Sequence, residues 1–144
     1  MSSKKSSLEL SVFKRSLLSA VIIATLFSIW TYFVNASYSP EAQLKAALTQ
    51  CGVSLIFGFS MTLLLEWWLM KFQTSSNSLI KFAMPVVLTM GLVILVTVTA
   101  HWMMQTPEIL TTILLPACAG IFFCSAYAFK RSKSLNIHQQ ETTA

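Results

Sequence analysis

Residues Ser39–Lys71 read SPEAQLKAALTQCGVSLIFGFSMTLLLEWWLMK, and this segment decides the fold. It opens on Ser39-Pro40-Glu41, in which a hydroxyl can cap a helix, a proline suits the first turn and a carboxylate faces the positive helix end. The twenty residues from Ala46 to Leu65 carry no charge, and about 20 residues cross the hydrocarbon core of a bilayer as a helix. A helix from Pro40 to Lys71 would be about 47 Å long at ~1.5 Å per residue. We therefore predict the longest helix of the chain here, tilted or projecting from the outer side of a membrane.

Three further uncharged apolar runs have a similar length, namely Leu17–Val34, Phe82–Ala100 and Ile109–Phe129. The chain has 144 residues, of which 55% are hydrophobic and 10% are charged, and this composition excludes an ordinary soluble domain. The runs do not alternate apolar and polar residues, so they do not indicate a membrane β-barrel. The sequence predicts an all-α, four-helix transmembrane bundle over residues 16–129, with spans at about 16–34, 40–71, 79–104 and 107–129. A basic N-terminal tail (1–15) and a polar, disordered C-terminal tail (130–144) should flank it.

The Lys and Arg residues indicate how the chain crosses the membrane. Apart from Lys45, they lie before the first span, around the 72–78 connection or after the last span: Lys4, Lys5, Lys14, Arg15, Lys71, Lys81, Lys130, Arg131 and Lys133. Because basic residues concentrate in cytoplasmic segments, we expect both termini in the cytoplasm of a bacterial-type inner membrane. The net charge of +5 then reflects topology, and we expect no binding of nucleic acid.

The first span has one alternative interpretation, and the two hairpins have another. Val34-Asn35-Ala36 would be a passable cleavage site for a signal peptide, although Trp30 and Tyr32 favour an uncleaved span with an outer aromatic belt. Thr106-Pro107-Glu108 repeats the Ser39-Pro40-Glu41 helix start 67 residues later. This offset suggests a duplicated two-helix hairpin, but any four-span protein needs alternate helix starts on the outer side, which explains the repeat more simply.

Small and polar residues recur every fourth position within the spans. Examples from three spans are Ala20, Ala24, Ser54, Gly58, Thr62, Gly120 and Cys124. Such residues let membrane helices approach closely, so we interpret the rows as packing surfaces between helices of this chain, of a second copy or of other membrane proteins. The alternative is that they line a pathway through the bundle.

Four polar residues within or near the spans are candidate functional residues. Glu66 and Lys81 should lie at similar depth near the cytoplasmic boundary, so we predict that they pair, or that Lys81 reaches lipid phosphates. Gln50 and His101 should lie near the outer ends of their spans, where the rise of two antiparallel helices allows them to meet. Glu66 lies beside the interfacial pair Trp67-Trp68, away from the mid-membrane depth that suits a proton-coupling carboxylate.

Metal and cofactor sites are not predicted. His101, Met103 and Met104 offer ligands suited to copper(I), but neighbouring residues on a helix point apart, so interfacial packing explains them better. All three cysteines, Cys51, Cys118 and Cys124, fall inside apolar runs, and none belongs to a CxxC motif. We therefore interpret them as small side chains that pack between helices.

The sequence lacks the common catalytic motifs. It contains no aspartate and no HExxH, GxSxG or glycine-rich phosphate loop, so we do not expect an enzyme. Abundant packing rows and scarce intramembrane charge favour a non-enzymatic accessory or assembly subunit. The alternative is an oligomeric transporter or channel for a small solute or ion that uses Glu66.

Overall fold

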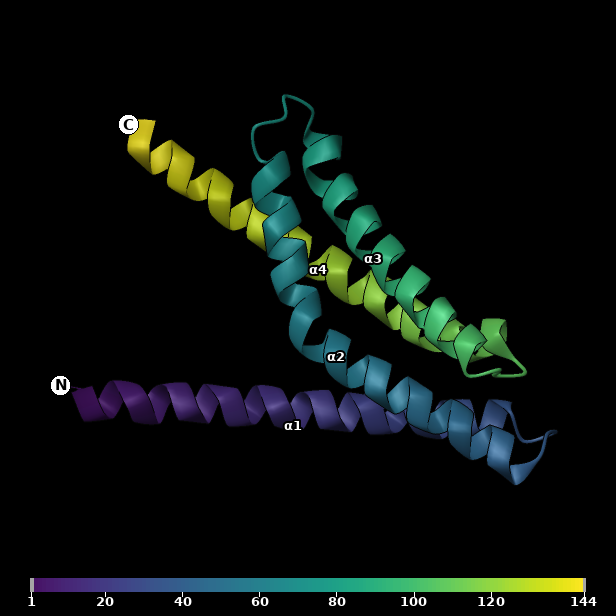
Figure 1. Cartoon of the computed structure of the whole chain (residues 1–144). Coiled ribbons are helices and arrows are strands. Elements are labelled where there is room, and N and C mark those ends of the chain that lie inside the picture. The colour runs from purple at the N-terminus through teal and green to yellow at the C-terminus, as the bar shows by residue number, and fades with distance from the viewer. Residues whose placement is uncertain (1, 144) are drawn as a thin grey trace.

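The chain forms an all-helical membrane protein. The computed structural model describes the backbone of residues 2–143 and the side chains of residues 17–77 and 79–131. Over this part of the chain the helices are α1 (Ser2–Val34), α2 (Pro40–Phe72), α3 (Ser78–Met103) and α4 (Ile109–Thr143) (Figure 1). Segments long and apolar enough to cross a membrane are Leu17–Val34, Pro40–Phe72, Leu79–Met103 and Ile109–Arg131. The predicted all-α architecture with four membrane-crossing segments is therefore confirmed.

Two predictions about helix length were wrong. Helix α4 has 35 residues and α1 has 33, so α2, with 33, is not the longest helix, although Pro40–Phe72 is the longest membrane-crossing segment. The backbone of residues 130–143 continues α4, where we expected a disordered tail. These residues include no glycine or proline, so nothing in the sequence stops a helix that is already formed. The basic side chains of residues 4, 5, 14, 15 and 133 lie outside the described residues.

The two predicted helix starts differ in the structure. Ser39 caps α2 by accepting a 3.3 Å hydrogen bond from the backbone N–H of Ala42, and Pro40 is the first helical residue. Thr106, in contrast, lies three residues before the start of α4 at Ile109 and binds a side chain of α3. The equivalence of the two starts, on which the suggestion of a duplicated hairpin partly rested, was therefore wrong.

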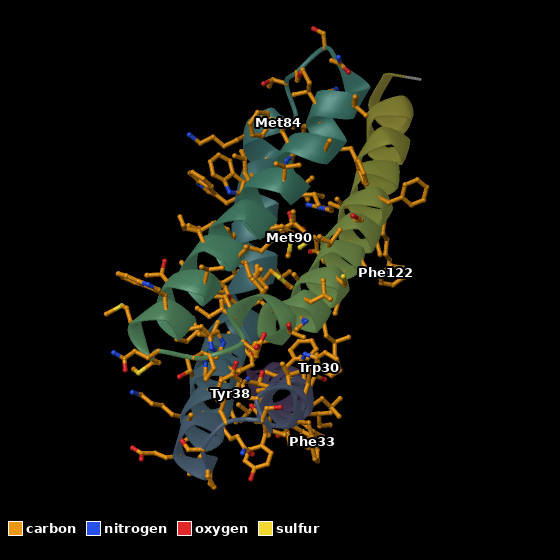
Figure 2. The ribbon with its side chains drawn as sticks, turned by 90° about the vertical axis from the view of Figure 1, so that its right-hand side faces the viewer. Trp30, Phe33, Tyr38, Met84, Met90 and Phe122 are labelled. Carbon is orange, nitrogen blue, oxygen red and sulfur yellow. The ribbon has the colours of Figure 1, made fainter. Side chains whose placement is uncertain are left out.

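Three of the helices share one hydrophobic core. Its buried residues come from α2, α3 and α4: Leu65, Leu69, Val86, Met90, Cys124 and Ala128. Helix α1 contributes none of them. Its buried apolar residues are Ala20 and Ala24, and Ala20 contacts α2. A Cβ placed on Gly58 of α2 would lie 3.1 Å from the Cβ of Ala20, so the missing side chain permits this close approach. Figure 2 shows Met90 between α3 and α4, with Phe33 and Phe122 pointing outward.

The helices are joined at one end and spread at the other. Figure 1 shows α1 beside the first half of α2, after which α2 bends away and continues beside α3. Helices α1 and α4 lie close at the end that carries the 35–39 and 104–108 loops, here called the loop end, and diverge toward the chain termini. This divergence separates one side of α1 from the three-helix core.

Candidate functional site

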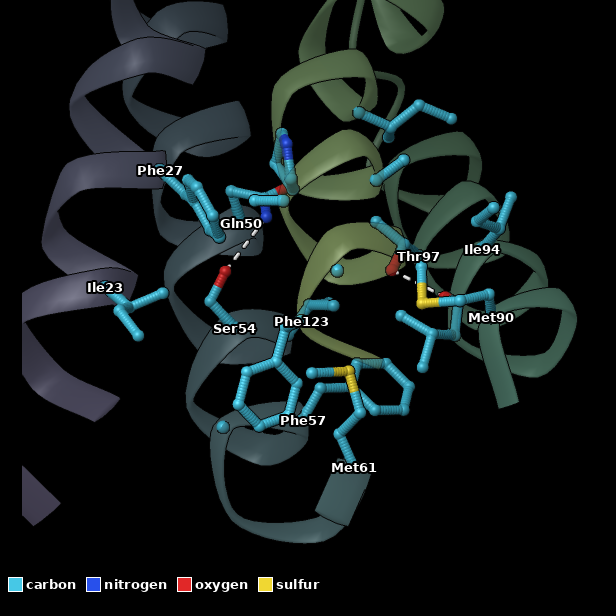
Figure 3. A pocket seen from close by; sticks show the side chains of 18 of the residues that line it. Ile23, Phe27, Gln50, Ser54, Phe57, Met61, Met90, Ile94, Thr97 and Phe123 are labelled. Atoms are coloured by element: carbon cyan, nitrogen blue, oxygen red, sulfur yellow. Dashed lines mark hydrogen bonds between the residues drawn. The ribbon is translucent and has the colours of Figure 1, made fainter. Parts of the chain in front are cut away.

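A cavity of about 580 Å³ lies between α1 and the three-helix core (Figure 3). All four helices line it, and its apolar wall includes Ile23, Phe27, Phe57, Met61, Ile94 and Phe123. The predicted packing rows contribute Ala20, Ser54, Gly58, Thr62 and Gly120 to the same wall, whereas Ala24 and Cys124 are buried in helix contacts. Small residues thus permit close helix contacts at some levels and leave space at others.

Polar side chains line the cavity at two levels. Gln50 and Ser54 of α2 and Thr97 of α3 lie on the side of the cavity nearer the loop end. Thr62 is twelve residues beyond Gln50, so the wall formed by α2 extends about 18 Å at ~1.5 Å per residue. No Asp, Glu, Lys, Arg or His is among the lining residues. Ser19 of α1 and Thr62 of α2 line the part farther from the loop end. The cavity is therefore uncharged and mostly apolar, with hydroxyl groups toward both ends and an amide only near the loop end.

A chain of buried hydrogen bonds leads into the cavity on the side nearer the loop end. The ring nitrogens of His101 lie 2.8 Å (Nδ1) from the Thr106 hydroxyl and 2.9 Å (Nε2) from Oε1 of Gln50. Gln50 in turn donates from Nε2 to the Ser54 hydroxyl oxygen at 2.9 Å (Figure 3). The structure thus brings Gln50 and His101 into contact, which the rise of two antiparallel helices allowed us to expect from the sequence. We call the series Thr106–His101–Gln50–Ser54 the relay.

The end of α3 holds Thr106 over His101. The backbone N–H of Thr106 donates to His101 O at 2.9 Å, and that of Gln105 donates to Trp102 O at 3.0 Å. This pair of bonds is a Schellman motif, in which glycine usually occupies the left-handed position. Gln105 has φ 56° there, and a non-glycine residue in this region costs about 1–2 kcal/mol. The contacts of Thr106 help to hold this strained turn in place.

Asn35 joins the two hairpins at the loop end. Its fully buried side chain donates to Thr31 O at 2.8 Å and to the Thr112 hydroxyl at 3.0 Å, and its Oδ1 accepts the backbone N–H of Glu108 at 3.1 Å. The Tyr38 hydroxyl donates to Glu108 Oε1 at 2.9 Å, and this hydrogen bond, together with the carboxylate charge, raises the pKa of Tyr38. The loop before α2 and the loop before α4 are therefore connected directly. We call these contacts the loop joint.

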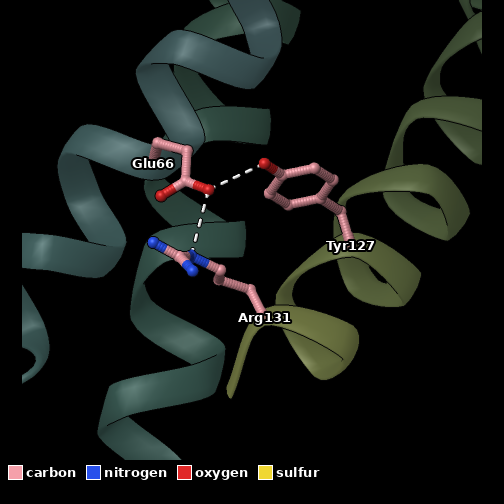
Figure 4. A network of polar contacts seen from close by, with 3 residues as sticks. All are labelled: Glu66, Tyr127 and Arg131. Atoms are coloured by element: carbon pink, nitrogen blue, oxygen red, sulfur yellow. Dashed lines mark hydrogen bonds and ion pairs between the residues drawn. The ribbon is translucent and has the colours of Figure 1, made fainter. Parts of the chain in front are cut away.

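Glu66 belongs to a separate cluster near the opposite end of the core. Its Oε1 accepts a 2.7 Å hydrogen bond from the Tyr127 hydroxyl and lies 3.3 Å from Nε of Arg131 (Figure 4). The prediction that Glu66 pairs with Lys81 was wrong, because α4 extends far enough to place Arg131 beside the carboxylate. Lys81 is exposed, and Glu66 is not among the residues that line the cavity.

The remaining candidate site is not assembled. His101 is buried with both ring nitrogens engaged, whereas Met103 and Met104 on the same turn are exposed. The side chains that could have bound copper(I) therefore lie in different environments. Among the described residues, no group of three His, Cys, Asp or Glu side chains could hold a metal ion.

No protein-family model, curated protein or solved structure matches the chain. The residues that line the cavity include no Asp, Glu, His, Lys, Arg or Cys side chain.

Proposed function

We propose that the protein is a non-enzymatic accessory protein of the inner membrane that binds an apolar guest molecule between α1 and the three-helix core. The uncharged cavity of about 580 Å³ within the membrane-crossing segments is the observation that carries this proposal. Pockets for small organic molecules typically measure about 300–1,000 Å³ and are mostly apolar. The volume and the wall therefore both suit a small or elongated hydrophobic molecule.

The arrangement of α1 supports entry from the bilayer. Contacts at the loop joint and with α2 hold α1, while its other side diverges from α4 (Figure 1). A guest dissolved in the hydrocarbon can reach the cavity through this side opening without crossing water. Because lipid tails are as apolar as the guest, binding must come from close packing and hydrogen bonds and not from the hydrophobic effect.

The distribution of basic residues supports an orientation with both termini in the cytoplasm and the loop joint outside. Lys71, Lys81, Lys130 and Arg131 lie toward the end of the bundle opposite the loop joint, which favours that end as the cytoplasmic one. Reporter fusions at each terminus and in the 104–108 loop test this orientation. A C-terminus on the outer side would contradict it.

The Glu66 cluster favours binding over transport driven by Glu66. The carboxylate is already engaged by Tyr127 and Arg131 and has no place in the cavity wall. A carboxylate that loads and releases a proton with each transport cycle would instead be expected beside the path of the solute. We therefore assign Glu66 to the attachment of α4 to α2.

A photoreactive hydrocarbon tests guest binding directly. The protein in lipid nanodiscs is irradiated with a tritiated long-chain alkyl diazirine, and labelled peptides are identified with and without excess unlabelled alkane. We expect competable labelling of cavity residues such as Met61 and Phe123, because these side chains line the space. Labelling that no competitor reduces, spread over the exposed faces, would contradict the proposal.

Two matched variants connect the labelling to the cavity. Ala119→Phe puts a large ring into the wall, whereas Ala126→Phe puts the same ring on an exposed position of α4 outside it. Filling the space should weaken guest binding by about tenfold, since overpacking costs roughly 1–3 kcal/mol. Equal effects of the two variants would argue against this cavity. Crosslinks to another membrane protein in native membranes, in place of a small molecule, would favour an assembly subunit with a partner helix in the opening.

A further inference from the structure

We propose that the cavity selects an uncharged guest whose polar head carries a hydrogen-bond acceptor, such as a ketone, ester or ether oxygen. This inference rests on the proposed function, because it names the class of molecule that the cavity would bind. Its basis is the direction of the hydrogen bonds in the relay, together with the absence of charge from the cavity wall.

In the relay, each hydrogen bond is donated in the direction of the cavity. Gln50 donates from Nε2 to Ser54, which leaves its Oε1 facing Nε2 of His101, and an amide oxygen can only accept. Nε2 of His101 must therefore carry the proton, so Nδ1 of the neutral ring accepts the hydroxyl proton of Thr106. Each group donates to the next one, and Ser54 stands at the end of the series.

Ser54 therefore presents a donor to the guest. Its side chain lines the cavity and is only 8% exposed, so bulk water is not its natural partner. Its oxygen already accepts from Gln50, and among the described residues its own O–H has no acceptor. A buried donor without a partner is costly, and an acceptor oxygen on the guest would satisfy it.

The rest of the wall determines the charge and shape of the guest. A cationic head would find no carboxylate and an anionic head no Lys or Arg among the lining residues, so a charged group would be desolvated without compensation. Beyond Ser54 the wall continues past Phe57 and Met61 and is mostly apolar, with the hydroxyls of Ser19 and Thr62 at its far part, which suits a mainly apolar chain. The head should therefore lie at Ser54 and the chain should extend toward Met61.

His101 acts here as a positioning residue. Its Nε2–H holds the Gln50 amide with the oxygen away from the cavity and the NH₂ group toward Ser54. Without that contact the Gln50 amide is free to rotate by 180°. Its oxygen would then accept the Ser54 hydroxyl proton, and Ser54 would no longer offer a free donor to the guest. The relay thus explains why a histidine and a glutamine are buried beside an otherwise apolar space.

A competition series tests the selectivity. Three competitors of equal chain length displace the alkyl diazirine from the protein in nanodiscs, namely an alkane, a methyl ketone and an alkylammonium ion. A neutral hydrogen bond to a buried donor corresponds to roughly a three- to tenfold gain in affinity, so the ketone should compete that much better than the alkane. The ammonium ion should compete least.

Two serine variants on one helix assign the effect. Ser54→Ala should reduce the ratio of ketone to alkane affinity to about one, because the donor for the ketone oxygen is removed. Ser60→Ala should keep the wild-type ratio, because Ser60 lies outside the cavity wall and donates to Ile56 O. Diazirine labelling that excess alkane still reduces shows that each variant has folded. His101→Leu should also lower the ratio of ketone to alkane affinity, although Ser54 itself is unchanged. The same alkane competition serves as its folding control.

The possible results separate the two proposals. Saturable alkane binding with no advantage for the ketone would overturn the selectivity and leave guest binding intact. A preference for the ammonium ion would overturn the selectivity as well. Failure of every competitor to reduce labelling would overturn guest binding itself, and the selectivity with it.

Discussion

Replacing Asn35 with alanine should loosen the joint between the two hairpins. The side chain is fully buried and makes three hydrogen bonds, to Thr31, Thr112 and the backbone N–H of Glu108. A net value of about 1 kcal/mol for each bond gives roughly 3 kcal/mol. The smaller mean measured inside membranes, about 0.6 kcal/mol, gives roughly 2 kcal/mol. We therefore expect Asn35→Ala to lower the free energy of unfolding by about 2–3 kcal/mol.

The matched control is a second asparagine that caps a helix on its own. Asn77 is exposed and accepts the Leu79 N–H at 2.9 Å within α3, so Asn77→Ala should cost only about 1 kcal/mol. Unfolding free energies of both variants can be measured by steric trapping in bicelles. If Asn35→Ala costs no more than Asn77→Ala, Asn35 is not the joint between the hairpins.

Two other predictions concern the core and the contact of α1 with α2. In a double-mutant cycle, Glu66→Gln and Tyr127→Phe should couple by about 0.5–1.5 kcal/mol in unfolding free energy. The control pair, Glu66→Gln and Lys81→Met, should show no coupling. Coupling of Glu66 to Lys81 in place of Tyr127 would contradict the observed cluster. Gly58→Leu should destabilise the protein by about 1–3 kcal/mol, because a Cβ at this position would lie 3.1 Å from Ala20 of α1. Gly52→Leu should be neutral or slightly stabilising, because a Cβ there would have nothing within 4 Å. Thermal unfolding that ranks the two variants in the opposite order would contradict this packing.

The membrane-crossing helices could be predicted because long uncharged runs have few alternatives in a bilayer. The start of α2 at Ser39-Pro40 followed from local capping chemistry, which needs no tertiary information. The meeting of Gln50 with His101 followed from helix rise in antiparallel neighbours. In each case the deciding interaction lies within one helix or between neighbours joined by a short loop.

Features that depend on distant segments could not be predicted in the same way. The partner of Glu66 was missed because Arg131 was assigned to a disordered tail, whereas α4 continues through it. Asn35 follows directly after a span and was read only as part of a possible cleavage site. Its role appears only when both loops fold against each other.

The cavity was missed for a further reason. Rows of small residues indicate where helices can approach, but they do not indicate which helix stays outside the core. Ala20 and Gly58 form a close contact and also border the cavity, because α1 leaves the core beside them. Five of the residues that we interpreted mainly as packing positions also border this space, namely Ala20, Ser54, Gly58, Thr62 and Gly120.

The central claim is that an uncharged guest-binding cavity separates α1 from the core. An experimental structure of the full chain in a lipid nanodisc, without added detergent, tests it most directly. We expect elongated density between α1 and α4, with one end beside Ser54 and the other near Met61 and Phe123. Helix α1 packed against α4 along its whole membrane-crossing length, with no space between them, would contradict it.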